Sequence, residues 1–446
     1  MSETQNIGPV TFDSNRQSVR SVVDLYRNGL LNLDPVFQRQ SVWRQRQREY
    51  LIDSVFHGYP IPAIFLYKHI DENTGTTMYE CVDGKQRLET LLMYTGVMRG
   101  RFSVSVQLPN SDRPQAVDWS LLRRSKQQSR IEEYLLQVIQ VEADLPDIIE
   151  LFVRINSTGN ALTRQEVRNA RFYRSPFLKT AKKLATRYES YLQRVGTIGA
   201  HQVRRMKHIE LLSELLYSAH IEGIANKKRV LDTAMRNDGL KGIQLHKAEQ
   251  ATTVGLNRLR RMFPDLSRSV RFHKISDFYS LAVAIQDLER RGFVLDNKKR
   301  NRLAWDLLVA LSVGVDELAM RSRKLDFKSL SPREELFRQY LQAVREGSDT
   351  EVNRRKRHDI ICGLIEPIYE RKDAKRGFSP EQRRILWNTA NERVCKECGC
   401  QLTWADFQAD HIKPFASGGK TDLANAAILC EEHNKKKGKK TRGSAA

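Results

Sequence analysis

Four residues near the C-terminus have the types and spacing of zinc ligands. Cys395 and Cys398 are separated by two residues, as are Cys430 and His433. Zinc prefers four soft or borderline donors in a tetrahedron, and a two-residue spacer lets a tight turn present both side chains to one ion. Two such pairs complete a closed site, so we predict a structural Zn²⁺. Cys400 is a spare thiol that can replace Cys398 if the turn is shifted.

A second group of residues between and after these pairs has the chemistry of phosphodiester hydrolysis. Asp410 and His411 are adjacent, and Asn434 directly follows His433. Hydrolysis needs an activated water, a Lewis acid for the developing alkoxide and positioned donors. Imidazole is the natural base near neutral pH, so we predict that His411 activates the attacking water. Asp410 points to the opposite face of its strand, yet at a strand end it can share a metal with a residue on a facing helix.

The order and spacing of these motifs resemble those of HNH endonucleases, which adopt a ββα-metal fold. The matching residues are Cys395-x2-Cys398, Asp410-His411-Ile-x-Pro, Ser417-Gly-Gly, Asp422-Leu-x-Asn425 and Leu429-Cys430-x2-His433-Asn434-x2-Lys437. The resemblance implies a catalytic metal between Asp410 and Asn434. It also implies that Asn425 orients the loop and the ring of His411. A pair of hard oxygen donors with open water positions suits Mg²⁺, with Mn²⁺ as a substitute.

The sequence departs from the HNH pattern at two positions. His433 replaces the more frequent fourth cysteine, which zinc tolerates. Asn434 stands at the position of the final histidine and can still ligate a metal through its carbonyl oxygen. The alternative is a zinc module that binds DNA without cutting it. Lysines suited to phosphate contacts follow under either interpretation, at Lys435, Lys436, Lys437, Lys439 and Lys440.

A turn in the N-terminal region could bind an anion. Asp83-Gly84-Lys85-Gln86-Arg87 lies between a predicted strand and a predicted helix. The free N–H groups and the dipole at a helix start favour phosphate, and Lys85 and Arg87 add positive charge. Gly84 permits the tight turn. An Asp-Gly turn that only caps a helix contains similar residues, so this motif alone leaves both interpretations open.

Two further motifs flank this turn and give it a family resemblance. They are Phe37-Gln38-Arg39-x3-Trp43 and Phe152-Val-Arg-Ile-Asn156-Ser-Thr-Gly159, the latter followed by Leu162-Thr-x2-Glu166-x-Arg168-Asn169-Ala170. Over roughly residues 15–175 the order resembles the ParB-like N-terminal domain of GmrSD-type restriction proteins. The usual central motif of that family is Asp-Gly-Gln-Gln-Arg, so Lys85 is a departure. The resemblance implies binding and hydrolysis of a nucleoside triphosphate and sensing of modified or phage DNA.

Carried over by position, the resemblance defines a nucleotide pocket. Its residues would be Gln38, Arg39, Asp83, Gly84, Lys85, Gln86, Arg87 and Asn156. Arg39 and Arg87 would face phosphates, which match the guanidinium fork, and Asp83 would hold a metal ion or a water. No Walker Gly-x4-Gly-Lys-Ser/Thr motif occurs, so triphosphate hydrolysis rests on the resemblance alone. The structural alternative is that Asn156 lies in a loop after a helix and that Trp43 is a core anchor.

Periodicity predicts the elements that position these residues. We expect helices at 18–28, 45–56 and 147–155, a helix between Gly84 and Gly96, and strands at 63–69, 78–82, 104–108 and 134–141. From about 176 to 344 apolar residues recur at helical spacing, which predicts an α-helical middle domain. Residues 347–349 and the basic run 354–357 mark a hinge region, unless one helix runs through them. Ser379-Pro380 predicts the N-cap of a helix that opens the last unit.

Composition limits the classes of function. The chain has 446 residues, 40% apolar and 29% charged, and a formal charge of +22. Such an excess favours a polyanionic partner, although a solubilising surface is the alternative. The first residues lack the apolar core of a secretory signal, and no apolar run is long enough to span a bilayer, so we expect a soluble cytoplasmic protein without membrane contact. In a reducing compartment the cysteine cluster favours a metal site over disulfides.

These observations combine into one hypothesis. We expect an α+β protein with a ParB-like, GmrSD-type nucleotide-binding sensor domain at 1–175, a helical middle domain at 176–350 and an HNH endonuclease domain with structural zinc at 351–446. The function would be metal-dependent DNA cleavage, regulated by a nucleoside triphosphate, in bacterial defence against phage or modified DNA. One alternative is a non-cleaving ParB-like DNA-binding protein, and another is an NTPase switch with a decayed HNH unit. Whether the chain forms a homo-oligomer or acts with partner defence subunits stays open.

Overall fold

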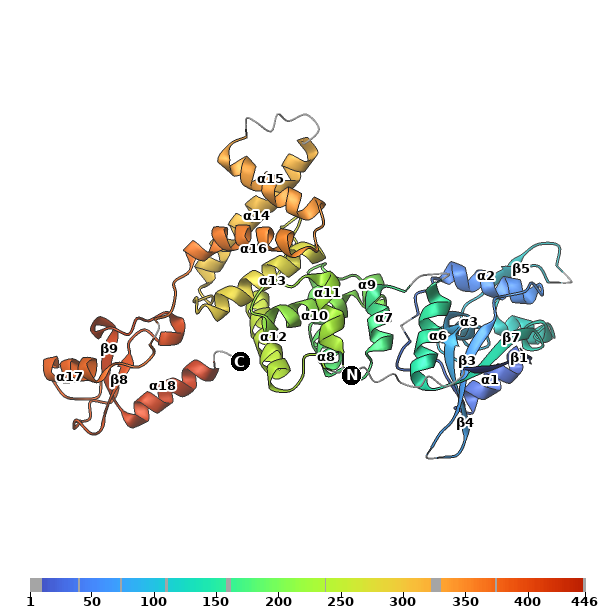
Figure 1. The fold of residues 1–446 in the computed structure, drawn as a ribbon, viewed down its shortest axis with the longest axis horizontal. Coiled ribbons are helices and arrows are strands. Elements are labelled where there is room, and N and C mark those ends of the chain that lie inside the picture. Colours follow the sequence, from blue (N-terminus) through green and yellow to red (C-terminus); the bar gives the residue numbers. More distant parts are fainter. Residues whose placement is uncertain are drawn as a thin grey trace, which may run out of the picture. The chain divides into compact units, whose positions relative to one another are not determined.

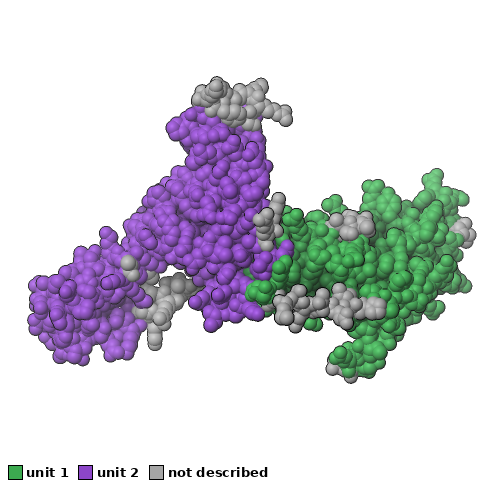
Figure 2. All heavy atoms as spheres, in the orientation of Figure 1, with its two compact units in different colours: residues 1–185, 199–210, 235–239 green, residues 186–198, 211–234, 240–446 purple. Residues whose placement is uncertain are grey.

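The structure is a computed structural model that describes residues 10–38, 41–72, 74–108, 111–157, 162–236, 238–321, 330–373 and 375–443. The chain divides into two compact units (Figure 2). Unit 1 comprises residues 1–185, 199–210 and 235–239, and unit 2 comprises residues 186–198, 211–234 and 240–446. Among the described helices, none is both long and apolar enough to cross a membrane.

Unit 1 is built on a mixed five-stranded sheet of order β1-β7-β3-β4-β2. Its strands are β1 (Thr11–Ser18), β2 (Leu31–Asn32), β3 (Ile64–Ile70), β4 (Thr77–Asp83) and β7 (Leu135–Glu142). β3 pairs antiparallel with β4 and parallel with β7, whereas β1 pairs antiparallel with β7. β5 (Val104–Val106) and β6 (Gln115–Val117) form a separate two-stranded sheet. The predicted strands at 63–69, 78–82 and 134–141 are thus confirmed within one or two residues.

Seven described helices accompany the sheets of unit 1 (Figure 1). They are α1 (Val19–Arg27), α2 (Gln45–Phe56), α3 (Lys85–Tyr94), α4 (Trp119–Arg124), α5 (Ser129–Glu132), α6 (Leu145–Ser157) and α7 (Arg164–Arg171). α1 contacts β1 and β2, and α6 contacts β4. The Ser18 hydroxyl accepts a hydrogen bond from the backbone N–H of Ser21, and Thr163 forms a capping box with Glu166. The predicted helices at 18–28, 45–56 and 147–155 are confirmed.

The helical part of unit 2 follows the predicted apolar spacing. The helices from Pro176 onward are α8 (Pro176–Arg194), α9 (Ala200–Arg204), α10 (Lys207–His220), α11 (Lys227–Met235), α12 (Gly242–Met262), α13 (Ile275–Arg290), α14 (Lys298–Arg321), α15 (Pro332–Arg345), α16 (Glu351–Ile365) and the short 3₁₀ helix η2 (Glu366–Ile368). α9 belongs to unit 1, and α8 and α10 begin there. α13 is buried over most of its surface, and α12 and α16 pack against it.

Residues 347–349 form the turn between α15 and α16, whereas the basic run 354–357 lies inside α16, so the hinge interpretation is wrong for the basic run. Arg354 and Arg357 point inward and are 2% and 0% exposed. Arg354 forms an ion pair with Glu214 and lies 4.0 Å from the ring centroid of Tyr279. Arg357 donates a 2.8 Å hydrogen bond to the carbonyl oxygen of Ser348. Because the arginines recur at helical spacing, two of them face the core with partners and not the solvent.

The C-terminal part of unit 2 is a hairpin followed directly by a helix. α17 (Pro380–Thr389) precedes β8 (Phe407–His411), the 3₁₀ turns η3 (Phe415–Ser417) and η4 (Leu423–Asn425), β9 (Ala426–Cys430) and α18 (Glu431–Gly443). Ser379 caps α17 by accepting a hydrogen bond from the N–H of Gln382, as predicted. β8 and β9 pair antiparallel with Asp410 opposite Ala427, and α18 contacts both strands. This arrangement is the ββα order expected of an HNH unit.

Candidate active site and metal centre

The hairpin and α17 share a small core that includes Cys395 and Cys430. Trp387, Phe407 and Leu429 are buried together with Cys395. The centroids of the Trp387 and Phe407 rings are 4.9 Å apart. The N–H of Lys396 donates a 3.0 Å hydrogen bond to the carbonyl oxygen of Ile428, which attaches the Cys395 turn to β9. The two predicted ligand pairs are therefore held on neighbouring segments.

The cysteine cluster can hold a metal, and it contains one more candidate ligand than the sequence required. The sulfur atoms of Cys395, Cys398, Cys400 and Cys430 all lie within 4.8 Å of one another. Nδ1 of His433 lies 3.2 Å from Sγ of Cys430 and 3.9 Å from Sγ of Cys395. Donors of a tetrahedral zinc site are about 3.5–3.8 Å apart, so the four sulfur atoms are close enough to share one ion. His433 lies next to Cys395 and Cys430 and could take the place of one sulfur ligand.

The electrostatics of Cys395 suit metal binding. Burial disfavours the thiolate, but hydrogen bonds from the backbone N–H groups of Cys430, Cys398 and Glu397 outweigh burial and lower the pKa of the Cys395 thiol to about 6. The thiolate is the form that ligates a metal. The turn therefore favours an ionised ligand at neutral pH.

His411 ends β8 and is held in a narrow, partly aromatic environment. It is 5% exposed, and its ring centroid lies 4.7 Å from that of Phe378 and 5.6 Å from that of Phe415. Burial lowers the pKa of His411, Asp410 opposes this shift, and Arg376 and Lys437 add to it. The imidazole is thus kept neutral at neutral pH, which is the form that can accept a proton.

Thr421 determines which ring nitrogen of His411 can accept that proton. Its hydroxyl lies 3.0 Å from Nε2 of His411 and donates a 2.8 Å hydrogen bond to the carbonyl oxygen of Lys375. A hydroxyl has one hydrogen, so Thr421 accepts the hydrogen bond from Nε2–H. Nδ1 then carries the lone pair. Nδ1 lies 3.9 Å from Oδ1 of Asp410.

Asp410 is next to a cationic group on the facing helix. Nζ of Lys437 lies 3.0 Å from Oδ2 of Asp410 and donates a 2.6 Å hydrogen bond to the carbonyl oxygen of His411. Asn434 is three residues before Lys437 in α18 and therefore lies on the same face of that helix, one turn away. A carboxylate and an amide oxygen are the kinds of donor that Mg²⁺ prefers.

Asn425 fastens the loop that joins β8 to β9. Its Nδ2 donates to the carbonyl oxygens of Lys413 (3.1 Å) and Lys420 (2.8 Å), and its Oδ1 accepts a 2.8 Å hydrogen bond from the N–H of Lys413. The Asn425 carbonyl also accepts from the N–H of Ile412. Asn425 therefore orders the loop. The His411 ring itself contacts Thr421, Phe378 and Phe415.

A glycine is required at position 419 because the backbone there lies very close to the carbonyl group of Lys413 and the side chain of Asn425. A Cβ atom there would lie 1.8 Å from the carbonyl oxygen of Lys413 and 2.7 Å from Nδ2 of Asn425. Both distances are far below van der Waals contact, so a side chain would displace the groups that Asn425 binds.

The segment before α17 completes the surroundings of His411. Oδ2 of Asp373 accepts a 2.5 Å hydrogen bond from the N–H of Thr421, and Lys375 accepts from its hydroxyl. The same segment is attached to the helical part of unit 2. There the N–H of Val294 donates to the carbonyl oxygen of Glu370, and the N–H of Lys372 donates to that of Gly292. We call residues 369–376, without residue 374, the connecting strap.

Lys435 and Lys436 carry less free charge than the sequence suggested. Both form exposed ion pairs one turn apart with Glu431 and Glu432, respectively. Such pairs contribute little to stability, and DNA phosphates could replace the glutamates. The side chains of Lys439 and Lys440 lie outside the described residues.

The structure gathers most of the predicted nucleotide residues at the β4–α3 turn of unit 1. Gly84 has φ +100° and begins α3 without a side-chain cap. Nη2 of Arg87 donates to Oδ2 of Asp83 (2.7 Å) and to the carbonyl oxygen of Ala63 (3.0 Å). Nε of Arg87 is buried and has no hydrogen-bond partner among the described residues. Lys85 pairs with Asp34 and lies 3.8 Å from Glu89.

Three of these residues bind the backbone of unit 1. Oε1 of Gln86 accepts hydrogen bonds from the N–H groups of Val42 (3.1 Å) and Trp43 (2.8 Å). Nε2 of Gln38 donates to the carbonyl oxygens of Cys81 and Val82, and Nδ2 of Asn156 donates to that of Phe152. The rings of Phe37 and Phe152 are 5.3 Å apart, which links α6 to this region. Arg39 and Gly159 lie outside the described residues.

The comparison with known families agrees with this geometry. Residues 19–173 match the family described as "GmrSD restriction endonuclease, N-terminal domain", and residues 395–440 match the family described as "HNH endonuclease". No curated protein matches the chain. The chain therefore joins a GmrSD-type N-terminal domain to a C-terminal HNH endonuclease domain, and it is a nuclease of restriction type with DNA as its substrate.

Sequence reasoning missed two features of this site. Thr421 contacts His411 and is itself held by Asp373, but a single threonine in a polar loop carries no signal of its own, and its partners are 46 and 48 residues away. The ion pair between Lys437 and Asp410 was also not predicted, although Lys437 belongs to the HNH motif. Contacts of this kind depend on how the hairpin meets the strap.

Proposed function

We propose that this protein is a DNA endonuclease whose HNH unit uses a divalent metal, and that a nucleotide-binding N-terminal domain regulates it in defence against phage or modified DNA. The observation that carries the proposal is the Asp410-His411 pair at the end of β8, facing α18 with a hydrogen-bonded, neutral His411. A binding module has no need to set the tautomer of a buried histidine.

The residues have distinct roles in the proposed cleavage. Nδ1 of His411 accepts a proton from the attacking water, while Thr421 holds Nε2–H and keeps the ring in place. Asp410 and Asn434 would hold Mg²⁺ or Mn²⁺, which stabilises the charge that develops on the leaving oxygen. Lys437 releases Asp410 and can then contact a phosphate. Asn425 fixes the loop that carries these groups.

Zn²⁺ would have a structural role. We propose Cys395, Cys398, Cys430 and His433 as its ligands, with Cys400 as a substitute ligand beside Cys398. A closed tetrahedron has no position for a substrate. The ion would attach the turn after α17 to the start of α18, so it positions Asn434 relative to Asp410.

The regulatory half of the proposal is supported by the β4–α3 turn. A helix N-terminus without a side-chain cap, next to Lys85 and Arg87, favours phosphate. The unbonded buried Nε of Arg87 is a donor that a phosphate oxygen could satisfy. Gln38, Gln86 and Asn156 would shape the pocket through the backbone that they bind. The proposal includes three domains, with boundaries at about residues 175 and 350.

A DNA cleavage assay tests the proposal. Purified protein is incubated with modified and unmodified phage DNA, each nucleoside triphosphate and Mg²⁺. We expect metal-dependent cleavage by the wild type, and a loss of about 10²–10⁴-fold for His411→Ala with DNA binding retained. His208→Ala, a substitution at another buried histidine, is the matched control.

The outcome also distinguishes the alternative of a non-cleaving DNA-binding protein. That protein would bind DNA without cutting it under every condition, and His411→Ala would leave its function unchanged. Wild-type cleavage by His411→Ala would contradict the catalytic role of the histidine.

A further inference from the structure

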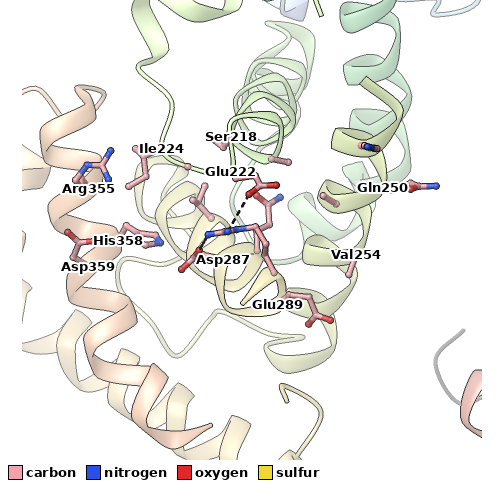
Figure 3. A pocket seen from close by; sticks show the side chains of 17 residues that line it. Ser218, Glu222, Ile224, Gln250, Val254, Asp287, Glu289, Arg355, His358 and Asp359 are labelled. Atoms are coloured by element: carbon pink, nitrogen blue, oxygen red, sulfur yellow. Dashed lines mark hydrogen bonds and ion pairs between the residues drawn. The ribbon is translucent and has the colours of Figure 1, made fainter. Parts of the chain in front are cut away.

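A cavity of about 560 Å³ lies in the helical part of unit 2, at a distance in sequence from both family matches. Residues of α10, α12, α13 and α16 line it, among them Ser218, Gln250, Asp287 and His358. Figure 3 shows His358 of α16 directed toward Asp287 of α13. The cavity is of the size that accommodates small ligands. None of the proposed roles of the HNH or GmrSD residues uses it.

Two side chains that line this cavity, and a third beside them, have metal-ligand chemistry. A carboxylate oxygen of Asp287, a ring nitrogen of His358 and Sγ of Cys362 all lie within 4.8 Å of one another. His358 and Cys362 are four residues apart in α16, so their side chains are on one face of the helix. Asp287 comes from the neighbouring helix α13. The donor set of sulfur, nitrogen and oxygen is one that zinc accepts.

Asp359 orients the imidazole of His358 as an outer carboxylate does in metal sites. Oδ1 of Asp359 lies 3.0 Å from Nδ1 of His358. A hydrogen bond from Nδ1–H leaves the lone pair on Nε2, and Nε2 lies 3.5 Å from Sγ of Cys362. Zn–S and Zn–N bonds of about 2.3 and 2.0–2.1 Å at a tetrahedral angle place nitrogen and sulfur about 3.5–3.6 Å apart. The observed distance equals that spacing.

The carboxylate of Asp287 is held by two arginines that have other partners. Its oxygens lie 2.6 Å from Nη2 of Arg290 and 3.3 Å from Nη1 of Arg291. Arg290 also pairs with Glu222, and Arg291 also pairs with Glu366. The arginines therefore keep a carboxylate partner when Asp287 turns one oxygen toward an ion. They also fix the position of the Asp287 side chain.

We propose that Asp287, His358 and Cys362 bind a divalent transition metal of the zinc class. Three protein ligands leave the fourth position to water or to a small ligand in the cavity, which is the arrangement of an open zinc site and not of a closed structural one. This site is separate from the cysteine cluster of the HNH unit. The competing explanation for the short distance is a simple S–H···N hydrogen bond between Cys362 and His358.

Metal counting on the full-length protein tests the proposal. The protein is stripped with a chelator and dialysed to equilibrium against buffered Zn²⁺, and bound zinc is measured by elemental analysis. We expect Cys362→Ser and His358→Gln each to bind one equivalent less than the wild type. Cys81→Ser, which changes a buried thiol on β4, should bind as much as the wild type.

A second measurement identifies the ligand. With Co²⁺ in place of Zn²⁺, each site should contribute its own thiolate-to-cobalt absorption. Cys362→Ser should remove the contribution of this site, and Cys430→Ser should reduce that of the cysteine cluster. Circular dichroism checks that each variant is folded. If Cys362→Ser does not fold, the zinc content of His358→Gln tests the proposal. Equal zinc content in the wild type, Cys362→Ser and His358→Gln would overturn the proposal and leave the hydrogen bond as the explanation.

Discussion

The hydroxyl of Thr421 lies 3.0 Å from Nε2 of His411 while it donates its only hydrogen to the carbonyl oxygen of Lys375. This pair of contacts gives Nε2 the proton and Nδ1 the lone pair, so the base of the proposed reaction is a particular atom. The two hydrogen bonds run from the imidazole of His411 through Thr421 to Lys375 in the connecting strap. A substitution at Thr421 therefore tests the mechanism while His411 and the proposed metal ligands stay unchanged in sequence.

Thr421→Val should lower kcat by roughly 10- to 100-fold, part of the about 10²–10⁴-fold that a positioned base supplies. The isosteric side chain cannot accept from Nε2–H, so the imidazole loses its fixed tautomer. Thr421→Ser keeps the hydroxyl and should restore most of the rate. Thr403→Val, which removes a hydroxyl that binds Asp406, is the control. Wild-type rates for Thr421→Val in a DNA cleavage assay would argue against the assigned tautomer.

Asn434→Ala should weaken the catalytic metal site and leave the zinc site intact. The amide oxygen is one of two protein donors proposed for Mg²⁺, so its loss raises the metal concentration needed for half-maximal cleavage. A large excess of Mg²⁺ or Mn²⁺ should partly restore the rate. Glu432→Ala, which breaks an exposed ion pair on the same helix, provides the comparison. Identical metal titrations for Asn434→Ala and the wild type would remove Asn434 from the site.

Substitution of single cysteines should distinguish the zinc ligands. Sγ of Cys400 is 3.3 Å from Sγ of Cys398, so either can replace the other as a ligand. Cys398→Ser should keep zinc with reduced affinity, and Cys398→Ser/Cys400→Ser should lose it and destabilise the C-terminal unit. Zinc analysis and proteolysis of the folded protein measure both effects. A folded C-terminal unit without zinc in the wild type would end this interpretation.

Gly419→Ala should disrupt the active-site loop. The added Cβ would overlap the carbonyl oxygen of Lys413, and overpacking of this kind costs roughly 1–3 kcal/mol. We expect reduced cleavage and faster hydrogen exchange at residues 411–425. Gly377→Ala is the matched control because a Cβ there meets no atom within 4 Å. Unchanged exchange in Gly419→Ala would show that the loop can move aside without loss.

Arg87→Ala should abolish binding of a nucleoside triphosphate to the N-terminal domain. The substitution removes the buried donor and the positive charge at the start of α3. Titration calorimetry with all four triphosphates measures binding, and Glu142→Ala, which breaks the exposed Lys68–Glu142 ion pair of the same sheet, is the control. Absence of binding to the wild type would mean that the GmrSD-type domain of this chain does not use a nucleotide.

Elements with a strong local pattern were predictable from the sequence. α2 begins and ends at the predicted residues because Gln45 to Phe56 carries apolar residues at helical spacing and is followed by Gly58. β1 was missed because its sequence, TFDSNRQS, is mostly polar and mostly exposed at the edge of the sheet. An edge strand is defined by its partner β7 and not by its own alternation.

In the candidate site, too, the residues of short local motifs were predictable and the contacts between distant segments were not. The cysteine cluster and the Asp410-His411 pair follow from short spacings that are visible in the sequence. The roles of Thr421, Asp373 and Lys375 depend on the approach of segments more than 40 residues apart, as their separations show. The basic run in α16 gave a wrong interpretation because charge alone does not reveal that Arg354 has Glu214 as a buried partner.

The connecting strap has a consequence for how this nuclease can be exchanged between proteins. The segment that matches the HNH family begins at Cys395, but Asp373 and Lys375, which hold Thr421, precede it. Recombination or grafting with a junction at Cys395 would transfer a histidine whose supporting residue lacks both partners. A junction before Tyr369 would carry the strap along, and the strap would lose instead its hydrogen bonds to Val294 and Gly292. The transferable catalytic module of this chain is therefore larger than its recognisable motif.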